Sequence, residues 1–278
     1  MSEIKRVGVL GCGLMGSGVA QVAAAAGYET RVRDVAPAIL DKARAGIEKS
    51  LARFVEKGKL AAPAKEAAVA RISWTTTVAD LKDCDIVIEA VTEDLDLKNA
   101  LWKELDGLCP DHTIFASNTS SLTIAAMAAA TKRPDRFVGL HFFNPVPLMQ
   151  LVEVVRTVTT SPQAFDRAFA FAQSLGKEAV TAKDNSGFIV NLLLVPYLLD
   201  AIRALEHGVA SVADIDKAMQ LGCGYPMGPL TLLDFVGLDT TYQIAEIMSG
   251  EYREQRYAPP PLLKRMVLAG HHGRKSGK

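Results

Sequence analysis

Short apolar runs and longer stretches of helical periodicity alternate along the first 184 residues. The apolar runs, which predict strands, occupy residues 6–10, 30–33, 86–90, 113–117, 137–142, 151–155 and 177–182. The helical stretches occupy residues 14–26, 97–108, 122–130 and 162–175. This alternation is typical of an α/β domain whose helices cover a doubly wound, mostly parallel sheet.

The stretch from residue 37 to 71 interrupts this alternation. It is rich in Ala and Lys, it reads as helix, and it is broken at Gly58 and Pro63. A simple strand–helix–strand unit does not need a segment of this length. We therefore expect a helical insertion within the first domain.

Helical periodicity dominates from residue 185 onward. The run Asp184-Asn185-Ser186-Gly187 consists of turn-forming residues and predicts a hinge, which sets the domains at 1–184 and 185–278. Within the second, all-helical domain, residues 192–205 are apolar on more than one face. Such a helix is either deeply buried or shared between subunits, so we expect a homodimer formed through this domain.

A glycine-rich turn follows the first predicted strand. Gly11, Gly13 and Gly16 form G-x-G-x-x-G between strand and helix, and the acid Asp34 lies at the end of the second strand. This is the context that a dinucleotide-binding fingerprint requires. The glycines allow a tight turn, close approach to a pyrophosphate and close packing of helix on strand. The alternative is a glycine-rich turn that binds nothing.

The fingerprint predicts a Rossmann-type domain with NAD as its cofactor. A carboxylate at Asp34 would accept a hydrogen bond from the ribose 2′-hydroxyl and repel a 2′-phosphate, which favours NAD over NADP. Arg33 beside it would weaken that preference, and an exposed strand-end acid is the alternative for Asp34. The residues expected around the pyrophosphate, at a helix N-terminus that favours anions, are Gly11, Gly13, Leu14, Met15 and Gly16.

Polar residues follow several predicted strands at the end where open α/β sheets bind ligands. Glu93 follows the strand 86–90, and the run Ser117-Asn118-Thr119-Ser120-Ser121 follows the next strand. His141 lies near the end of the strand 137–142. Helix capping is the alternative role for the serine and threonine run.

Glu153 lies within the otherwise apolar strand 151–155, where a buried carboxylate is costly unless it is paired. The short, proline-containing connection would return this strand beside the preceding one and bring Glu153 near His141. A carboxylate beside imidazole fixes its tautomer and raises its basicity, which suits a general base for hydride transfer to NAD. Ser120 and Asn144 would then hydrogen-bond around the reacting oxygen and the nicotinamide. The alternatives are a core histidine and a glutamate paired elsewhere.

Composition narrows the classes further. The 31 basic residues balance the 31 acidic residues of the 278-residue chain, so nothing favours nucleic acid or an anionic membrane as partner. The most apolar stretch, residues 188–199, is shorter than the roughly 20 residues of a membrane span. The four cysteines have no metal-ligand spacing, so we expect neither a metal site nor disulfides. A reducing compartment and a first strand that leaves no room for a leader predict a cytoplasmic protein.

Five segments together resemble the L-3-hydroxyacyl-CoA dehydrogenase family, most closely its short-chain 3-hydroxybutyryl-CoA members. They are residues 117–121, 141–147, 151–155, 186–191 and 224–230. The resemblance runs from about residue 5 to the end of the sequence. It implies a Rossmann domain followed by a helical dimerisation domain, NAD as cofactor, and oxidation of (S)-3-hydroxyacyl-CoA to 3-oxoacyl-CoA or its reverse.

The resemblance also implies roles for single residues. His141 matches the catalytic base and Glu153 its orienting partner, while Ser120 and Asn191 match contacts to the substrate oxygen. The matched additional cofactor contacts are Glu93, Lys98, Asn144 and Lys275. The CoA contacts, which match more loosely, are Ser50 and Lys57 in the helical insertion. An amide that specifies packing is the alternative for Asn191.

Two departures from the family pattern stand out. Leu192 occupies a position that is often Arg in the family, and the family's short aromatic tail after Lys278 is missing, which leaves Lys275 with less anchoring. Two other functions stay open. One is a dehydrogenase of the same fold for a free hydroxy or sugar acid, and the other is a catalytically silent, structural NAD-binding relative.

Overall fold

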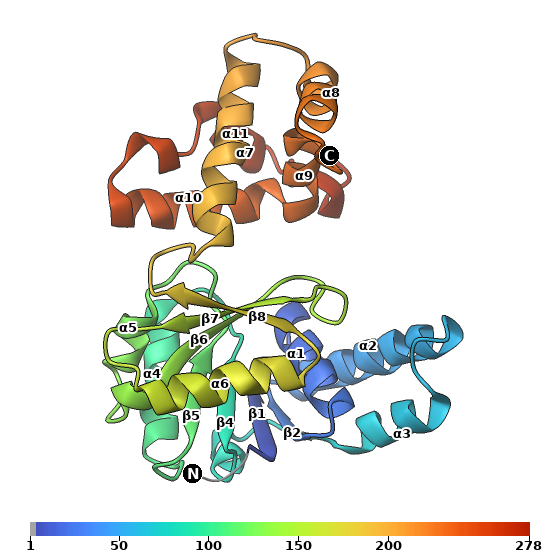
Figure 1. Ribbon diagram of the computed structural model, residues 1–278, viewed down its shortest axis with the longest axis vertical. Helices are drawn as coiled ribbons and strands as arrows, with labels where there is room; N and C mark the ends of the chain where they lie inside the picture. Colours follow the sequence, from blue (N-terminus) through green and yellow to red (C-terminus); the bar gives the residue numbers. More distant parts are fainter. Residues whose placement is uncertain (1–3) are drawn as a thin grey trace. The chain divides into compact units, whose positions relative to one another are not determined.

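A computed structural model describes residues 4–278, which form two compact units that divide between Asp184 and Asn185 (Figure 1). The first unit contains a sheet with helices on it, and the second unit is helical. The predicted fold class, a Rossmann-type α/β domain followed by an all-helical domain, is confirmed.

The sheet of the first unit has eight strands in the order β3-β2-β1-β4-β5-β6-β7-β8. Their bounds are β1 Arg6–Leu10, β2 Glu29–Arg33, β3 Ile72–Thr75, β4 Ile86–Glu89, β5 Ile114–Ser117, β6 Phe137–Phe142, β7 Leu151–Arg156 and β8 Glu178–Lys183. Neighbouring strands are parallel except β6 and β7, which are antiparallel. The chain reverses between them because only residues 143–150 connect the two strands, too few for a crossover helix.

Helices cover both faces of the sheet. Their bounds are α1 Leu14–Ala25, α2 Pro37–Glu56, α3 Ala62–Ala70, α4 Leu95–Asp106, α5 Ile124–Ala128 and α6 Pro162–Ser174, with the 3₁₀ turns η1 Val78–Leu81 and η2 Pro134–Arg136. Alternate residues of a strand face opposite sides. Ile114 and Ala116 of β5 therefore join the core cluster beneath α1, α2, α3 and α6. Phe115 packs against Trp102 of α4, with ring centroids 5.0 Å apart.

The predicted insertion is two helices, α2 and α3, that pack on each other and on α1. Gly58 ends the first helix with a positive φ of 66°, as its sequence position predicts. Pro63 does not break a helix, because it lies in the first turn of α3, where proline lacks no needed N–H. The strand β3 that follows was not predicted from the pattern.

The second unit has its own core. Its helices are α7 Val190–Glu206, α8 Val212–Cys223, α9 Pro229–Val236, α10 Leu238–Tyr252 and α11 Pro261–Leu268, with the 3₁₀ turns η3 Gln255–Tyr257 and η4 Gly273–Lys275. Buried residues of α7, α9, α10 and α11 form one hydrophobic cluster. Leu198 and Leu199 of α7 face this cluster, whereas Leu193 is 65% exposed. Within residues 4–278, no helix combines the length and apolar character needed to cross a membrane.

Candidate active site

The three fingerprint glycines each meet a different spatial demand. Gly11 has a φ of 89°, and a Cβ there would lie 2.8 Å from the carbonyl oxygen of Ala90. A Cβ on Gly16 would collide with the carbonyl of Gly11, so only glycine lets α1 start this close to β1. A Cβ on Gly13 would meet nothing within 4 Å, so the turn is open at its middle glycine. This geometry fits a pyrophosphate seated on the turn.

Asp34 follows β2 and is tied to the same turn. Its Oδ2 accepts a hydrogen bond from the backbone N–H of Cys12 at 2.7 Å, and its Oδ1 accepts one from Val35 N–H at 2.7 Å. Burial, and then the nearby Asp34, raise the pKa of the Cys12 thiol to about 12. The Cys12 thiol therefore stays neutral at neutral pH, and Asp34 is the carboxyl side chain that holds this turn.

His141 and Glu153 lie opposite each other in the β6–β7 pairing. The Nδ1 atom of His141 is 2.6 Å from Oε2 of Glu153, and the two residues are 4% and 0% exposed. A carboxylate at Nδ1 favours the tautomer with its hydrogen on that nitrogen and a lone pair on Nε2. Phe143 packs beside the imidazole, with ring centroids 4.5 Å apart. The arrangement can position an imidazole to take up a proton.

Asn118 is a site residue whose role the sequence did not reveal. Its Oδ1 accepts a hydrogen bond from Phe142 N–H at 3.0 Å, so the loop after β5 holds the residue that follows His141. Asn118 is 7% exposed. Its place in the polar run 117–121 was the available signal, but a polar run does not say which side chain turns inward.

Glu93 and Ser120, both predicted site residues, are brought together by the fold. The Glu93 carboxylate accepts hydrogen bonds from Ser120 N–H at 3.0 Å and from Thr119 Oγ1 at 2.9 and 3.0 Å. The loops after β4 and β5 are therefore joined at the carboxyl-terminal end of these parallel strands, the end at which His141 lies on β6. Ser120 itself is partly exposed, which leaves its side chain within reach of a ligand.

Lys98 is predicted as a cofactor contact, and the structure places it in the interior. It is 1% exposed, and its Nζ lies 2.5 Å from Oε1 of Glu89 and 3.4 Å from Oε2 of Glu93. Glu89 was not predicted. The signal for it was a carboxylate at the end of the apolar run 86–90, the same kind of signal that identified Glu153.

A cleft of about 630 Å³ adjoins the fingerprint turn. It is lined by the start of α1, one face of α2 and the loop after β6. Among the predicted residues, Gly13, Leu14, Ser50 and Asn144 line it. Lys57, at the C-terminal end of α2, does not belong to its lining.

Asn191 and Lys275 belong to the second unit. Asn191 lies in the first turn of α7 and is partly buried. Lys275 forms an ion pair with Asp239, with Nζ 2.5 Å from Oδ1. Burial alone would raise the pKa of Asp239, but the hydrogen bonds from Lys275 and the Thr240 backbone outweigh it and lower that pKa.

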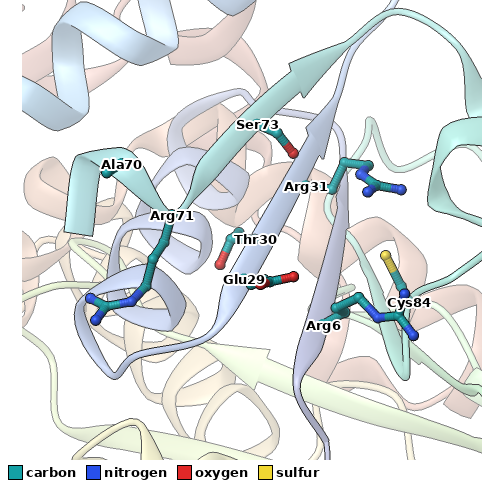
Figure 2. A pocket seen from close by; sticks show the side chains of 8 residues that line it. All are labelled: Arg6, Glu29, Thr30, Arg31, Ala70, Arg71, Ser73 and Cys84. Atoms are coloured by element: carbon teal, nitrogen blue, oxygen red, sulfur yellow. The ribbon is translucent and has the colours of Figure 1, made fainter. Parts of the chain in front are cut away.

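A smaller pocket of about 260 Å³ lies at the opposite edge of the sheet and contains three arginines. Figure 2 shows Arg71 directed away from Arg31 and Arg6, with Glu29 between them. Positive charge therefore does not converge on one point there, unlike the polar groups of the fingerprint edge.

Comparison with known proteins identifies the family to which these site residues belong. Residues 6–185 match the family described as 3-hydroxyacyl-CoA dehydrogenase, NAD binding domain, and residues 187–278 match the family's C-terminal domain. The chain belongs to the 3-hydroxyacyl-CoA dehydrogenase family. As a member it is an NAD-dependent oxidoreductase, so the predicted family, enzyme class and cofactor are confirmed.

Individual family members are similar over nearly the whole chain. The 3-hydroxybutyryl-CoA dehydrogenase of Mycobacterium tuberculosis is 51% identical over 277 residues, which cover 99% of this chain and 97% of the relative. Human mitochondrial hydroxyacyl-coenzyme A dehydrogenase is 50% identical, covering 99% and 90%. The crystal structure of (S)-3-hydroxybutyryl-CoA dehydrogenase from Ralstonia eutropha superposes with a TM-score of 0.95 at 44% identity, covering 99% and 98%.

Proposed function

We propose that this 3-hydroxyacyl-CoA dehydrogenase acts on short-chain substrates, oxidising (S)-3-hydroxybutyryl-CoA to acetoacetyl-CoA or catalysing the reverse reduction. The observation that carries the mechanism is the buried pair of His141 and Glu153, 2.6 Å apart. The proposal of a short acyl chain in the substrate rests on the relatives named 3-hydroxybutyryl-CoA dehydrogenase.

In the oxidation, the Nε2 atom of His141 takes the proton of the substrate hydroxyl. Glu153 holds the ring in the tautomer that leaves Nε2 basic, and it stabilises the imidazolium that forms. Bound NAD would supply the hydride acceptor for the substrate carbon that carries this hydroxyl. In the reduction, His141 returns its proton to the oxygen.

Neutral hydrogen-bonding groups complete the proposed site. Ser120 and Asn191 bind the reacting oxygen, and Asn144 binds near the nicotinamide. These groups orient the substrate without titrating near neutral pH. The partly exposed Ser120, held through its backbone by Glu93, supports this role.

The proposed cofactor site follows the fingerprint. Backbone groups of Gly11, Gly13, Leu14, Met15 and Gly16 receive the pyrophosphate, and Asp34 receives the ribose hydroxyls. The open middle glycine and the position of Asp34 against the turn support this placement. The proposed additional contacts are Glu93 and Lys275, while Lys98 acts indirectly from the interior.

The CoA portion of the substrate is proposed to follow α2. Ser50 lines the cleft beside the fingerprint, and Lys57 lies seven residues later, which puts it on the same face of the helix two turns on. A lysine at that point suits a nucleotide phosphate. The second unit is proposed as the dimerisation and substrate domain.

We also propose a cytoplasmic homodimer. The exposed Leu193 on the apolar helix α7 supports a contact between subunits. Free cysteines at all four positions, three of them buried, suit a reducing compartment.

One assay separates the proposed function from its alternatives. NADH oxidation is followed by absorbance with acetoacetyl-CoA, with free acetoacetate and with no acceptor. Activity that requires acetoacetyl-CoA supports the proposal. Equal or greater NADH oxidation with free acetoacetate favours the free-acid dehydrogenase, and NADH binding without any turnover favours a silent structural relative.

A further inference from the structure

Lys98 has little free charge to offer a cofactor. Its ammonium group is almost fully buried and lies between two carboxylates, 2.5 Å from Glu89 and 3.4 Å from Glu93. A buried ion pair of this kind is poorly screened by water, so the lysine is bound strongly to its own neighbours. Any effect of Lys98 on catalysis must therefore pass through the carboxylates.

Glu89 is the more deeply buried of these two carboxylates. It is the last residue of β4, fully buried, and it pairs in register with Leu10 just before the fingerprint turn and with Ser117 at the end of β5. Its carboxylate accepts hydrogen bonds from Ser117 Oγ at 2.6 Å and from Val91 N–H at 2.7 Å. Burial raises the pKa of Glu89, and Lys98 and these donors oppose the rise.

Glu93 is the carboxylate that faces the site. It holds Ser120 through the backbone N–H and Thr119 through its hydroxyl. It is also the second neighbour of Lys98. The position of Glu93 therefore reflects a balance between its hydrogen bonds to the Thr119–Ser120 turn and its attraction to Lys98.

We propose that Glu89 is a positioning residue for the dehydrogenase reaction. It neutralises Lys98 from the interior side, so that Glu93 stays on the Thr119–Ser120 turn and keeps Ser120 in place. The proposal rests on the proposed role of Ser120 at the substrate oxygen and of Glu93 at the cofactor. It assigns to Glu89 and Lys98 an indirect action, in place of a direct contact of Lys98 with the cofactor.

The proposal predicts that a second substitution, at Lys98, restores part of the activity that a substitution of Glu89 removes. Glu89→Gln keeps a hydrogen-bond acceptor but leaves Lys98 with Glu93 as the remaining carboxylate of its two ion pairs, which draws Glu93 away from Ser120 N–H. Glu89→Gln combined with Lys98→Met removes both charges, so Glu93 is no longer pulled inward. The double variant should therefore be more active than Glu89→Gln alone, a coupling that a double-mutant cycle measures.

A matched control lies at the other end of the same strand. Asp85, just before β4, is also a buried carboxylate and accepts hydrogen bonds from the N–H groups of Lys5 and Arg6. Asp85→Asn removes a buried charge from β4 at the sheet edge opposite the site. It reports how far a loss of stability alone changes activity.

The experiment measures kcat and KM with acetoacetyl-CoA, the dissociation constant of NADH by fluorescence, and Tm for these variants. We expect Glu89→Gln to lower kcat about 10- to 100-fold, as a displaced site group does. We expect it to weaken NADH binding about fivefold, the effect of one disturbed hydrogen bond. Asp85→Asn, at a comparable loss in Tm, should change neither value more than about twofold.

The proposal is overturned if Glu89→Gln and Asp85→Asn change kcat and NADH affinity equally when compared per folded enzyme. It is also overturned if the double variant is no more active than Glu89→Gln. Failure of the proposed function would look different, because wild-type enzyme would then not turn over acetoacetyl-CoA. In that case the dissociation constant of NADH still tests the positioning role of Glu89. Unchanged NADH affinity in Glu89→Gln would overturn the positioning role, and weakened affinity relative to Asp85→Asn would support it.

Discussion

His141 on β6 and Glu153 on β7 are direct partners across the antiparallel pair in the sheet, with Nδ1 2.6 Å from Oε2. The relation depends on register, because a slip of one residue would turn one of the two side chains to the opposite face. Thr160, which follows β7, helps to hold the two strands together at the start of β6, because its Oγ1 donates a hydrogen bond to the carbonyl of Phe137 at 2.7 Å. The backbone thus fixes the pair before any substrate binds.

The first prediction concerns this pair. His141→Gln should lower kcat by about 10²–10⁴-fold, the usual contribution of a general base, while NADH affinity stays near that of wild type. Steady-state kinetics and NADH fluorescence titration measure the two quantities. Near-wild-type kcat, with the chemical step shown to limit the rate, would remove His141 as the base. Glu153→Gln should reduce kcat as well, because the ring loses its orienting charge.

The second prediction concerns cofactor choice. Wild-type enzyme should have a higher kcat/KM with NADH than with NADPH, because Asp34 repels a 2′-phosphate. Asp34→Ala should narrow the difference, chiefly by raising KM for NADH. Equal or higher kcat/KM of the wild type with NADPH would contradict the role of Asp34. His141→Gln serves as control, since it should leave the NADH-to-NADPH ratio of affinities unchanged.

The third prediction concerns the CoA portion. Lys57→Glu should raise KM for acetoacetyl-CoA, and added salt should partly mimic this in the wild type by screening the charge. Lys49→Glu is the matched control, because Lys49 is an exposed lysine of α2 that does not share the helix face of Ser50 and Lys57. Similar KM values for the two variants would exclude Lys57 from the CoA site. Ser50→Ala tests the cleft itself in the same assay.

The fourth prediction concerns stability against acid. Burial opposes ionisation of Asp85, but hydrogen bonds from Arg6, Lys5 and His112 outweigh it and lower the pKa of the carboxyl below 3.8. A lowered pKa in the folded state stabilises the fold above the unfolded value, and this stabilisation is lost as the pH falls through the folded value. Asp85→Asn should therefore lower the free energy of unfolding by about 1–2 kcal/mol at pH 7.

Denaturant titrations at pH 7 and near pH 3 check this expectation. The difference between wild type and Asp85→Asn should shrink at the lower pH, because protonation removes the charge from the wild type as well. A difference that stays constant across this range would show that the ionised carboxylate is not what stabilises the end of β4.

The fifth prediction concerns the proposed dimer. Leu193→Glu places a charge on an exposed apolar position of α7 and should shift the protein toward monomer in sedimentation experiments. Val158→Glu is the control, because Val158 is 97% exposed in the first unit. Equal sedimentation of both variants as dimers would place the contact elsewhere.

The His141–Glu153 pair can be predicted from the sequence, because a charged residue in an apolar strand and a short connection between the strands leave few geometries. The strand β3 cannot be predicted in this way, because its four residues closely follow a helix and pair with β2 as the outermost strand of the sheet. Such a short run carries too little pattern to separate it from the helix before it. The burial of Lys98 could not be predicted either, because its partner Glu89 lies nine residues away on another element and meets it only in the folded chain.

The hydrogen bond from Cys12 N–H to Asp34 has a consequence for redesign of the enzyme. The carboxylate that would discriminate between dinucleotides also fastens the glycine turn to the end of β2. Replacing it with a small apolar or a basic residue would release the turn at the same moment as it admits a phosphate. A variant built to use NADPH therefore needs an uncharged acceptor at position 34, such as Asn or Ser, with the positive charge supplied from a neighbouring position.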